Sequence, residues 1–458
     1  MSFDSPTCAV LRSKVPDSWD VLPLADVTDF QEGPGILAKD FTEVGVPLLR
    51  LRNMEGARVN LSGSNFLDPR KVEKKWAHFA LSEGDFLIST SASLGRVSVV
   101  GPEAEGAIAY TGIIRFRSRS KKLNHDYLRA FLSSAAFVEQ AEQMATGSVI
   151  KHFGPSHLKQ MAIVLPSLEE QAQIASIFDV LDHRIALVRE TNATLEAIAQ
   201  ALFKSWFVDF DPVRAKMEGR APGGMDAETA ALFPDSLEES KLGLVPKGWS
   251  VGTIDQATSL IIDYRGKTPK KLGREWSSSG IPAVSAKNIK RGRLVEKQAM
   301  NFVDAELFDL WMKDKLAPGD VLMTSEAPLG ELVYLAEDHN FCISQRVFAL
   351  RANPMNCFPS FLYFSLTSSE IQERLSARAT GTTVVGIRQS ELRKVEMLFP
   401  PLSIQKMAND TLSSCLLKIE KNEALNETLT TLRDTLLPRL ISGQLRLSEA
   451  ADQVKRAA

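Results

Sequence analysis

Residues 165–206 read LPSLEEQAQIASIFDVLDHRIALVRETNATLEAIAQALFKSW, and this segment predicts one long helix. After Pro166 it contains neither glycine nor proline, and from Ile174 to Trp206 apolar positions recur at a strict spacing of four and three residues. This is the a/d pattern of a coiled-coil helix. Such a helix gains most of its stability by burying its apolar stripe, so it requires a partner. The expected coiled-coil seam consists of Ile174, Phe178, Leu181, Ile185, Val188, Asn192, Leu195 and Leu202.

A second such helix is predicted because the chain repeats itself once, with an offset of 234 or 235 residues, as from Gln171 to Gln405 and from Asp85 to Asp320. Both glutamines end a Pro-x-Leu-x-x-Gln entry into a helix, and both aspartates belong to a Gly-Asp turn before an apolar run. Collinear matches of this kind indicate a duplicated structural unit. The second seam is weaker and consists of Leu412, Ile419, Asn426, Leu429, Leu436 and Leu440.

Two asparagines, Asn192 and Asn426, fall on the same a position of the two predicted helices. A buried amide at one a position fixes the register and orientation of a helix pair at a cost in stability. Alternatively, either amide turns toward solvent at a helix end.

A region of short β-type runs, punctuated by glycine and proline, precedes each helix and predicts a mixed α/β globule. Residues 211–246 form a Gly/Pro-containing connector long enough to span one helix, which allows the helices to run antiparallel. The predicted fold is therefore α+β, with two mixed α/β domains joined by two long antiparallel coiled-coil helices in a pseudo-twofold internal repeat. The expected boundaries are 1–16 for an N-terminal arm, 17–165 for the first globule, 166–210 for the first helix, 211–246 for the connector, 247–400 for the second globule, 401–443 for the second helix and 444–458 for a C-terminal tail.

The composition is that of an ordinary globular protein, with 44% hydrophobic residues and a net charge of −2. This balance excludes a wholly basic protein that coats nucleic acid, although local basic faces remain possible. The four cysteines form no C-x-x-C pair, so neither a disulfide framework nor a thiolate zinc site is predicted. No apolar run is long enough for a membrane span, and a cytoplasmic location is expected.

Known catalytic motifs are matched only in part. Gly266-Lys267-Thr268 resembles the end of a phosphate-binding P-loop, but Ile261 stands where the first glycine is required. The Pro-Pro pair after Phe399 lacks the flanking residues of an amino-methyltransferase motif, and the six histidines form no i,i+4 pair with a carboxylate. No catalytic residue, metal site or cofactor of this chain is therefore predicted.

Positive charge is concentrated locally. Between Asp263 and Lys297 there are ten lysines or arginines against three acidic residues, a local charge of +7. The first globule has a shorter basic run from Arg115 to Lys122. Lysine and arginine at this density suit DNA phosphates, and neighbouring Asn, Ser and Thr side chains suit base edges. A solvated face without a ligand is the alternative.

Two globules that each close with a Gly-(Ser/Thr) pair, followed by a Pro-x-Leu-x-x-Gln entry into a long helix, resemble the DNA specificity subunit of Type I restriction-modification enzymes. The resemblance covers nearly the whole chain. It is carried by Gly147–Phe153, Leu165–Gln171 and Leu202–Pro212 in the first half, and by Gly381–Val384, Phe399–Gln405 and Leu436–Leu445 in the second.

The resemblance implies two target recognition domains that read the two parts of a bipartite site on double-stranded DNA, with the helices as a ruler between them. It also implies a subunit without an active site or cofactor of its own. Two methyltransferase subunits would supply S-adenosylmethionine-dependent adenine methylation, and restriction/translocase subunits would use ATP and Mg to cut DNA. The outer helix faces and the Trp206-Phe207 end are candidate docking surfaces for the methyltransferase.

Within this interpretation, DNA contacts are predicted for Arg52, Asn53, Ser91, Ser93, Arg96, Arg115 and Lys151 in the first half and for Arg265, Lys267, Thr268, Lys290, Arg293, Arg346 and Arg388 in the second. Two alternatives stay open. One is a coiled-coil scaffold whose globules bind protein partners, and the other is a nuclease or methyltransferase that acts alone.

Overall fold

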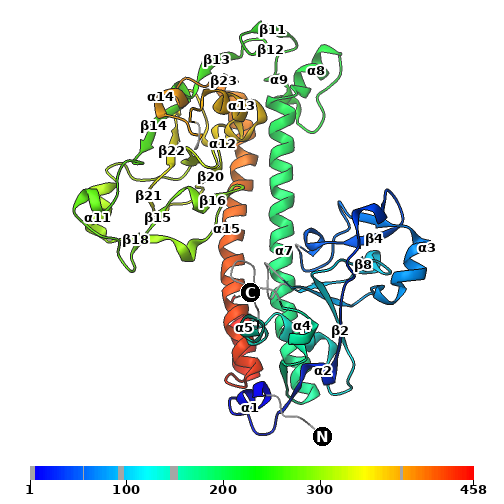
Figure 1. Cartoon of the computed structure of the whole chain (residues 1–458). Coiled ribbons are helices and arrows are strands. Elements are labelled where there is room, and N and C mark those ends of the chain that lie inside the picture. Colours follow the sequence, from blue (N-terminus) through cyan, green and yellow to red (C-terminus); the bar gives the residue numbers. More distant parts are fainter. Residues whose placement is uncertain (1–5, 55, 91–96, 145–152, 382–384, 458) are drawn as a thin grey trace. The chain divides into compact units, whose positions relative to one another are not determined.

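Two helices of 40 residues each, α7 (Leu168–Phe207) and α15 (Leu402–Ile441), dominate the computed structural model (Figure 1). The structure describes residues 6–54, 56–90, 97–144, 153–381 and 385–457. By their internal contacts the residues form two compact units, Met1–Arg189 with Ala424–Ala458, and Glu190–Glu423. Each long helix is divided between the two units close to its middle.

The sequence explains where the helices begin and end. The Ser167 hydroxyl accepts a hydrogen bond from the Glu170 backbone N–H (3.2 Å), and the Glu170 carboxylate accepts one from the Ser167 N–H (3.0 Å). This reciprocal capping box follows Pro166 and starts α7. The second helix, α15, ends at a glycine. Gly443 adopts a positive φ of 72°, and the Leu445 N–H donates to the Arg439 carbonyl (3.0 Å). A glycine of this kind closes a helix without steric cost.

The two helices pack against each other within each unit, in opposite chain directions. In the first unit the early part of α7, with Ile174 and Phe178, shares one core with Leu436 and Leu440 from the end of α15. In the second unit Phe203, near the end of α7, shares a core with residues from the start of α15. The antiparallel pairing agrees with the predicted fold class.

The side chains expected in the seam are buried to different degrees. In the first half of α7 and at the ends of α15 they are buried, whereas Leu195, Leu202, Ile419 and Asn426 are only half-buried. Near its end α7 buries Phe203 in place of Leu202. An α-helix drifts relative to a strict seven-residue repeat, and here the other elements of the second unit also surround α7.

The first unit carries its α/β domain before α7 and a short helix after α15. Its elements are α1 (Pro6–Arg12), β1 (Asp20–Pro23), α2 (Leu24–Val27), β2 (Thr28–Glu32), β3 (Phe41–Thr42), β4 (Val46–Leu49), β5 (Asn65–Leu67), α3 (Pro69–Lys71), β6 (Phe86–Ser89), β7 (Val97–Val99), β8 (Ile108–Ala109), β9 (Ile113–Ser118), α4 (His125–Leu132), α5 (Ala135–Met144), α6 (Pro155–Leu158), β10 (Ala162–Leu165) and α16 (Leu447–Ala457).

The second unit contains residues 211–246, predicted as a connector, which form α8, α9 and the hairpin β11–β12. Its elements are α8 (Asp211–Met217), α9 (Ala227–Ala231), β11 (Leu237–Ser240), β12 (Gly243–Pro246), β13 (Ser250–Thr253), α10 (Ile254–Ala257), β14 (Thr258–Asp263), β15 (Ile281–Val284), β16 (Ile289–Lys290), β17 (Arg293–Leu294), β18 (Asn301–Val303), α11 (Ala305–Trp311), β19 (Val321–Thr324), β20 (Leu332–Tyr334), β21 (Cys342–Ile343), β22 (Val347–Ala352), α12 (Pro359–Thr367), α13 (Ser369–Arg378), α14 (Gln389–Leu392) and β23 (Glu396–Phe399).

The sheets show the internal repeat directly. The first domain has an antiparallel sheet of order β2-β9-β6-β7, and the second has one of order β14-β22-β19-β20. Each domain also has a second sheet with one parallel pair, β4 with β8 and β15 with β21. The central strands β6 and β19 are buried along their whole length. Two copies of one α/β domain are therefore present, as predicted.

The glutamine of the repeated Pro-x-Leu-x-x-Gln motif joins each domain to its helix. The Gln171 amide donates to the carbonyls of Lys122 and Pro166 (both 2.9 Å) and accepts from the Asn124 N–H (2.8 Å). Gln405 makes the same three kinds of hydrogen bond in the second copy.

None of the helices described is long and apolar enough to cross a membrane.

Candidate nucleic-acid interface

The hairpin β16–β17 presents cations of the second domain to solvent. Its turn, Arg291–Gly292, has positive φ at both residues (49° and 77°), as two-residue hairpin turns require. The Arg291 N–H donates to the Glu331 carboxylate (2.6 Å), which fastens the turn. The side chains of Lys290 and Arg291 are exposed and make no hydrogen bond or ion pair with the residues described. These two cations are available to a phosphate group.

Arg293, which was also predicted to contact DNA, instead ties this hairpin to both long helices. Its guanidinium donates to Glu196 on α7 (2.8 Å) and lies 3.1 Å from Glu423 on α15. The same Glu423 oxygen accepts from the amide of Asn192 (2.8 Å), and the Asn192 oxygen accepts from Asn422 (2.7 Å). Arg293 is therefore a positioning residue for the hairpin.

Two further residues of the +7 segment are engaged inside the second domain. Arg265 pairs with Asp263 (2.8 Å) and lies 4.0 Å above the Phe348 ring. Lys267 donates to the Trp311 carbonyl (2.7 Å), and burial lowers its pKa. If Arg265 or Lys267 contacted DNA as predicted, these interactions within the domain would have to be broken.

The other residues of the second domain that were predicted to contact DNA are one turn residue and two exposed arginines. The Thr268 hydroxyl accepts from the Lys271 N–H (3.3 Å) and holds a turn. Arg346 has a φ of 67° and pairs with Glu326 (3.2 Å), although its side chain is about half exposed. Arg388 is exposed just before α14 and has no partner among the residues described. Arg388 therefore joins Lys290 and Arg291 as an available cation.

In the first domain the side chain of Asn53 is buried and fully engaged. Its oxygen accepts from the Arg50 N–H (2.8 Å), and its amide donates to the Asn60 carbonyl (2.7 Å) and the Ser64 hydroxyl (3.1 Å). Asn288, at the equivalent position of the second copy, is likewise buried and holds its own loop. The hypothesis that Asn53 reads a base does not fit this loop-stabilising role.

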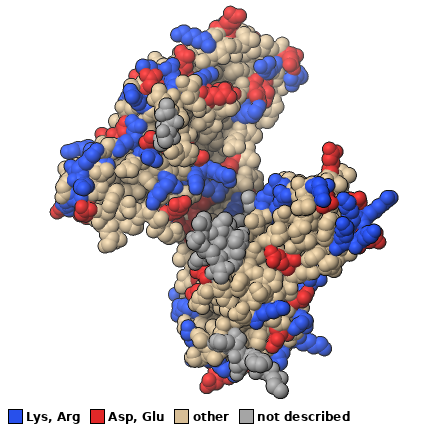
Figure 2. Space-filling view, viewed as in Figure 1, with Lys and Arg blue, Asp and Glu red and all other residues tan. Residues whose placement is uncertain are grey.

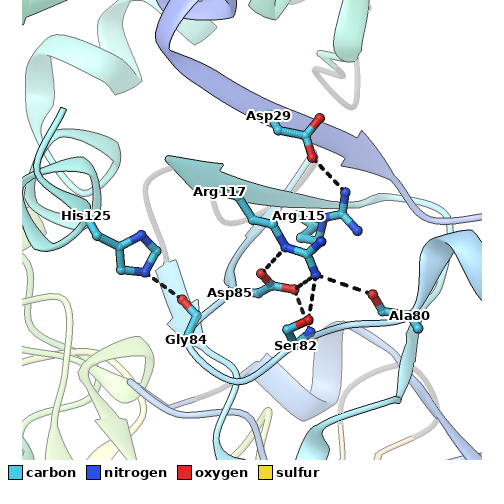
Figure 3. A network of polar contacts seen from close by, with 8 residues as sticks. All are labelled: Asp29, Ala80, Ser82, Gly84, Asp85, Arg115, Arg117 and His125. Atoms are coloured by element: carbon cyan, nitrogen blue, oxygen red, sulfur yellow. Dashed lines mark hydrogen bonds and ion pairs between the residues drawn. The ribbon is translucent and has the colours of Figure 1, made fainter. Parts of the chain in front are cut away.

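The basic run on β9 is also used internally (Figure 3). Arg115 is only 6% exposed and donates to Asp29 (3.0 Å) on β2. Arg117 forms a bidentate pair with Asp85 (2.5 and 2.7 Å), which the repeat reproduces as Arg351 with Asp320 (both 2.8 Å). Arg115 is thus a structural residue, so its predicted contact with DNA is not supported by its surroundings.

Figure 3 also shows why the Gly-Asp turn is repeated. The Asp85 carboxylate accepts from the Ser82 N–H (2.8 Å), so one side chain both closes the turn and binds Arg117. Gly84 has a positive φ of 85°, and its carbonyl lies 2.9 Å from His125 Nε2. The motif organises the start of β6.

Of the remaining first-domain candidates, Arg52 is exposed and makes one long hydrogen bond to Asn65 (3.4 Å). Ser91, Ser93, Arg96 and Lys151 lie outside the described residues. A basic group on α3 and the following turn was not predicted, because its cations form two short pairs, Arg70-Lys71 and Lys74-Lys75, separated by Val72 and Glu73. Their spacing around buried Val72 would have been the signal.

The Trp206-Phe207 end of α7 is not a free surface, so the structure does not support it as a docking site for a partner. Trp206 and Phe207 are 8% and 6% exposed, and their rings contact Phe233 (centroids 5.2 Å apart) and Phe361 (5.0 Å). Elsewhere on α7, large apolar side chains remain about half exposed. These are Leu168, Val180, Leu187 and Ile198.

Within the described ranges no group of three or more His, Cys, Asp or Glu side chains is placed to hold a metal ion. Lys267 of the P-loop-like Gly266-Lys267-Thr268 donates to the Trp311 carbonyl, so its ammonium group is engaged within the domain. All four cysteines are buried free thiols, and burial raises the pKa of Cys342 to about 12.

Comparison with known proteins agrees with this architecture. The sequence model of the family described as "Type I restriction modification DNA specificity domain" matches two segments, residues 16–197 and 246–431. The Type I restriction enzyme HindI specificity subunit of Haemophilus influenzae is 26% identical over 410 residues, covering 80% of this chain and 87% of that protein. The MjaIX specificity subunit of Methanocaldococcus jannaschii is 24% identical over 444 residues, covering 95% of each. The crystal structure of a Type I restriction-modification S subunit from M. genitalium has a related fold, with a TM-score of 0.59, 14% identity, and coverage of 93% and 96%.

Proposed function

The chain belongs to the family of Type I restriction-modification DNA specificity domains, and on this premise we propose that it reads a bipartite sequence on double-stranded DNA. The observation that carries the proposal is the duplication. The family domain occurs twice, and each copy is a separate α/β domain with its own sheets, fastened by Gln171 or Gln405 to the start of a long helix. One domain would read each half of the site.

The two helices would act as the ruler between the half-sites. At a rise of about 1.5 Å per residue, a helix of 40 residues is about 60 Å long. The clamp formed by Arg293 supports this role in the second unit, because it links the hairpin that carries Lys290 and Arg291 to both helices. DNA contacts would then come from exposed cations such as Lys290, Arg291, Arg388 and Arg52, which can approach phosphates.

As a specificity subunit, the chain would recruit its catalytic partners and need no cofactor itself. We assign methyltransferase docking to the outer face of α7, because Val180 and Leu187 remain about half exposed there. Two methyltransferase subunits would use S-adenosylmethionine to methylate adenine. Restriction subunits would use ATP and Mg, and the complex would act in the cytoplasm.

The proposal is tested by mapping methylated adenines in DNA exposed to this chain together with its methyltransferase subunits. We expect a motif of two half-sites with a fixed gap, and no methylation when the chain is omitted. Specific binding should also weaken steeply as salt is raised. A contiguous motif, or methylation that does not depend on the chain, contradicts the proposal.

A further inference from the structure

A short basic helix lies on the outside of the first domain. It consists of α3 (Pro69–Lys71) and the π-helical turn that follows it (Val72–Trp76). Val72 and Trp76 turn inward and pack against a small core. The cations on its exposed side are Arg70, Lys71, Lys74 and Lys75, and Lys39 lies nearby. In Figure 2 the blue side chains at the right-hand edge lie over this helix.

Five cations face three carboxylates here, those of Asp40, Asp68 and Glu73, so the group keeps a local charge of +2. Lys71 pairs with Asp40 (3.0 Å), and the Asp68 carboxylate is occupied by the backbone N–H of Arg70 (2.9 Å). The side chains of Arg70, Lys74 and Lys75 have no hydrogen-bond or ion-pair partner in the part of the chain that the structure describes. The hydrogen bond from Lys71, together with the charges of the neighbouring lysines, holds the pKa of Asp40 below its usual value. The local field is therefore positive even beside a carboxylate.

The second domain provides an internal comparison. Its helix α11 corresponds in position to α3. The helix α11 follows β18, which pairs with β15, just as α3 follows β5, which pairs with β4. Asp304 caps α11 by accepting from the Leu307 N–H (2.7 Å), and Asp68 caps α3 in the same way. However, α11 carries Glu306 and Asp309 on its exposed side. The fold accepts acidic residues at this position, so it does not require the cations of the first domain.

We infer that the exposed face of Arg70, Lys74 and Lys75 binds backbone phosphates of DNA without regard to sequence, in addition to the contacts that read the site. The inference rests on the proposed function, which brings a duplex to the domain. Residues one helical turn apart, such as Arg70 and Lys74, have Cβ atoms about 6 Å from each other, so their long side chains can engage neighbouring phosphates. The described part of the second domain has no comparable face at this position, because Glu306 and Asp309 of α11 pair with Arg274 (3.1 Å) and Lys315 (2.6 Å).

The test uses the full chain assembled with its methyltransferase subunits and the triple variant Arg70→Gln, Lys74→Gln, Lys75→Gln. The matched control is Arg12→Gln, Lys14→Gln, Lys121→Gln, which removes the same charge from exposed positions of the first unit. Binding to a cognate duplex and to a duplex of scrambled sequence is measured between 0.05 and 0.2 M salt.

Each phosphate contact adds ~0.9 to the slope of log affinity against log salt. Loss of three contacts should lower the slope by about 2.7, so the defect of the variant should be about 40-fold larger at the low-salt end than at the high-salt end. Both duplexes should be affected equally, and the methylated motif should stay the same.

Unchanged affinity and slope in the triple variant, while the wild type binds its site, overturn the inference and leave the proposed function intact. A defect equal to that of the control variant also overturns it, because general charge would then be responsible. Loss of methyltransferase assembly would identify the face as a protein interface instead. A wild-type complex that does not prefer the cognate duplex rejects the proposed function itself.

Discussion

Asn192 is a buried polar residue of the second unit with a full set of hydrogen bonds. Its side chain is fully buried, donates to Glu423 (2.8 Å) and to the Ile419 carbonyl (3.3 Å), and accepts from Asn422 (2.7 Å). A buried polar group costs free energy unless all of its hydrogen bonds are made. Here they are made only in one helix register.

We expect Asn192→Ala to lower the free energy of unfolding of the full chain by about 1–3 kcal/mol, since Asn422 would lose its acceptor in the core. The double variant Asn192→Leu, Asn422→Leu should recover much of this loss, because both polar groups are removed together. Thermal unfolding followed by calorimetry measures both. A single variant as stable as the wild type would show that the pair is hydrated.

For single residues, the sequence predicts where a side chain lies in a helix better than it predicts which residue it contacts. The heptad pattern placed Asn192 in the seam, but its partner is Asn422 and not the equivalent Asn426. The residue that corresponds to Asn422 in the first helix is Val188, which has no amide. Likewise, the charge of Arg115 was evident, but its pairing with Asp29 depends on β2 lying beside β9, 86 positions away.

The hairpin β16–β17 is one of the elements that attach the second domain to the helices, through Arg293. We expect Arg293→Ala to raise backbone hydrogen exchange in residues 289–294 by about tenfold or more, because charge-assisted hydrogen bonds contribute ~1.5–3 kcal/mol each. Arg293→Lys should not restore protection, since one ammonium group does not reproduce a guanidinium that reaches two carboxylates. Exchange detected by mass spectrometry measures the effect.

Arg346→Ala is the matched control for this change, because Arg346 pairs with one carboxylate on an exposed loop. It should leave residues 289–294 as protected as in the wild type. Equal exchange in the wild type and Arg293→Ala would mean that the clamp does not hold the hairpin.

The outer face of α7 gives a second prediction for an element. We expect Val180→Asp with Leu187→Asp to weaken binding of the methyltransferase subunit by at least about 30-fold, which corresponds to ~2 kcal/mol. Both side chains are about half exposed, so the melting temperature of the free chain should not fall. Analytical ultracentrifugation of the mixed subunits measures the affinity.

The control, Leu37→Asp with Val44→Asp, introduces the same charges at exposed apolar positions of the first domain. Its assembly should match that of the wild type. If the control loses assembly as strongly as the α7 variant, docking on this helix face is refuted.

Elements differ in how far the sequence specifies them. The helices were predictable because their periodicity, capping residues and closing glycine are local signals, as at Ser167, Glu170 and Gly443. The order of the strands was not, because β2 pairs with β9 through side chains that come together only in the folded domain. The basic face of α3 was missed for a related reason. Its cations form a group only on one side of a short helix whose other side is buried.

For the whole molecule, the duplication was the most informative signal. It predicted two copies of one domain and an antiparallel pair of helices, and the sheets repeat the same strand order in both copies. Net charge was less informative, because −2 averages over exposed cations, internal ion pairs such as Arg117 with Asp85, and the acidic helix α11. The function of each charge depends on its partner and not on its density along the chain.

The ruler hypothesis makes a prediction for the whole molecule. One heptad inserted into α7 between Arg189 and Glu190, with a matching heptad in α15 between Glu423 and Ala424, keeps both halves of each seam in phase to within about 20°. Seven residues lengthen each helix by about 10 Å, or about three base pairs at ~3.4 Å each. The methylated motif should therefore keep both half-sites and gain about three base pairs between them. Inserting the same heptads into the C-terminal tail controls for added length and should leave the gap unchanged. Because each insertion falls between the two compact units, retained half-sites with an unaltered gap would mean that something other than the helices sets the spacing.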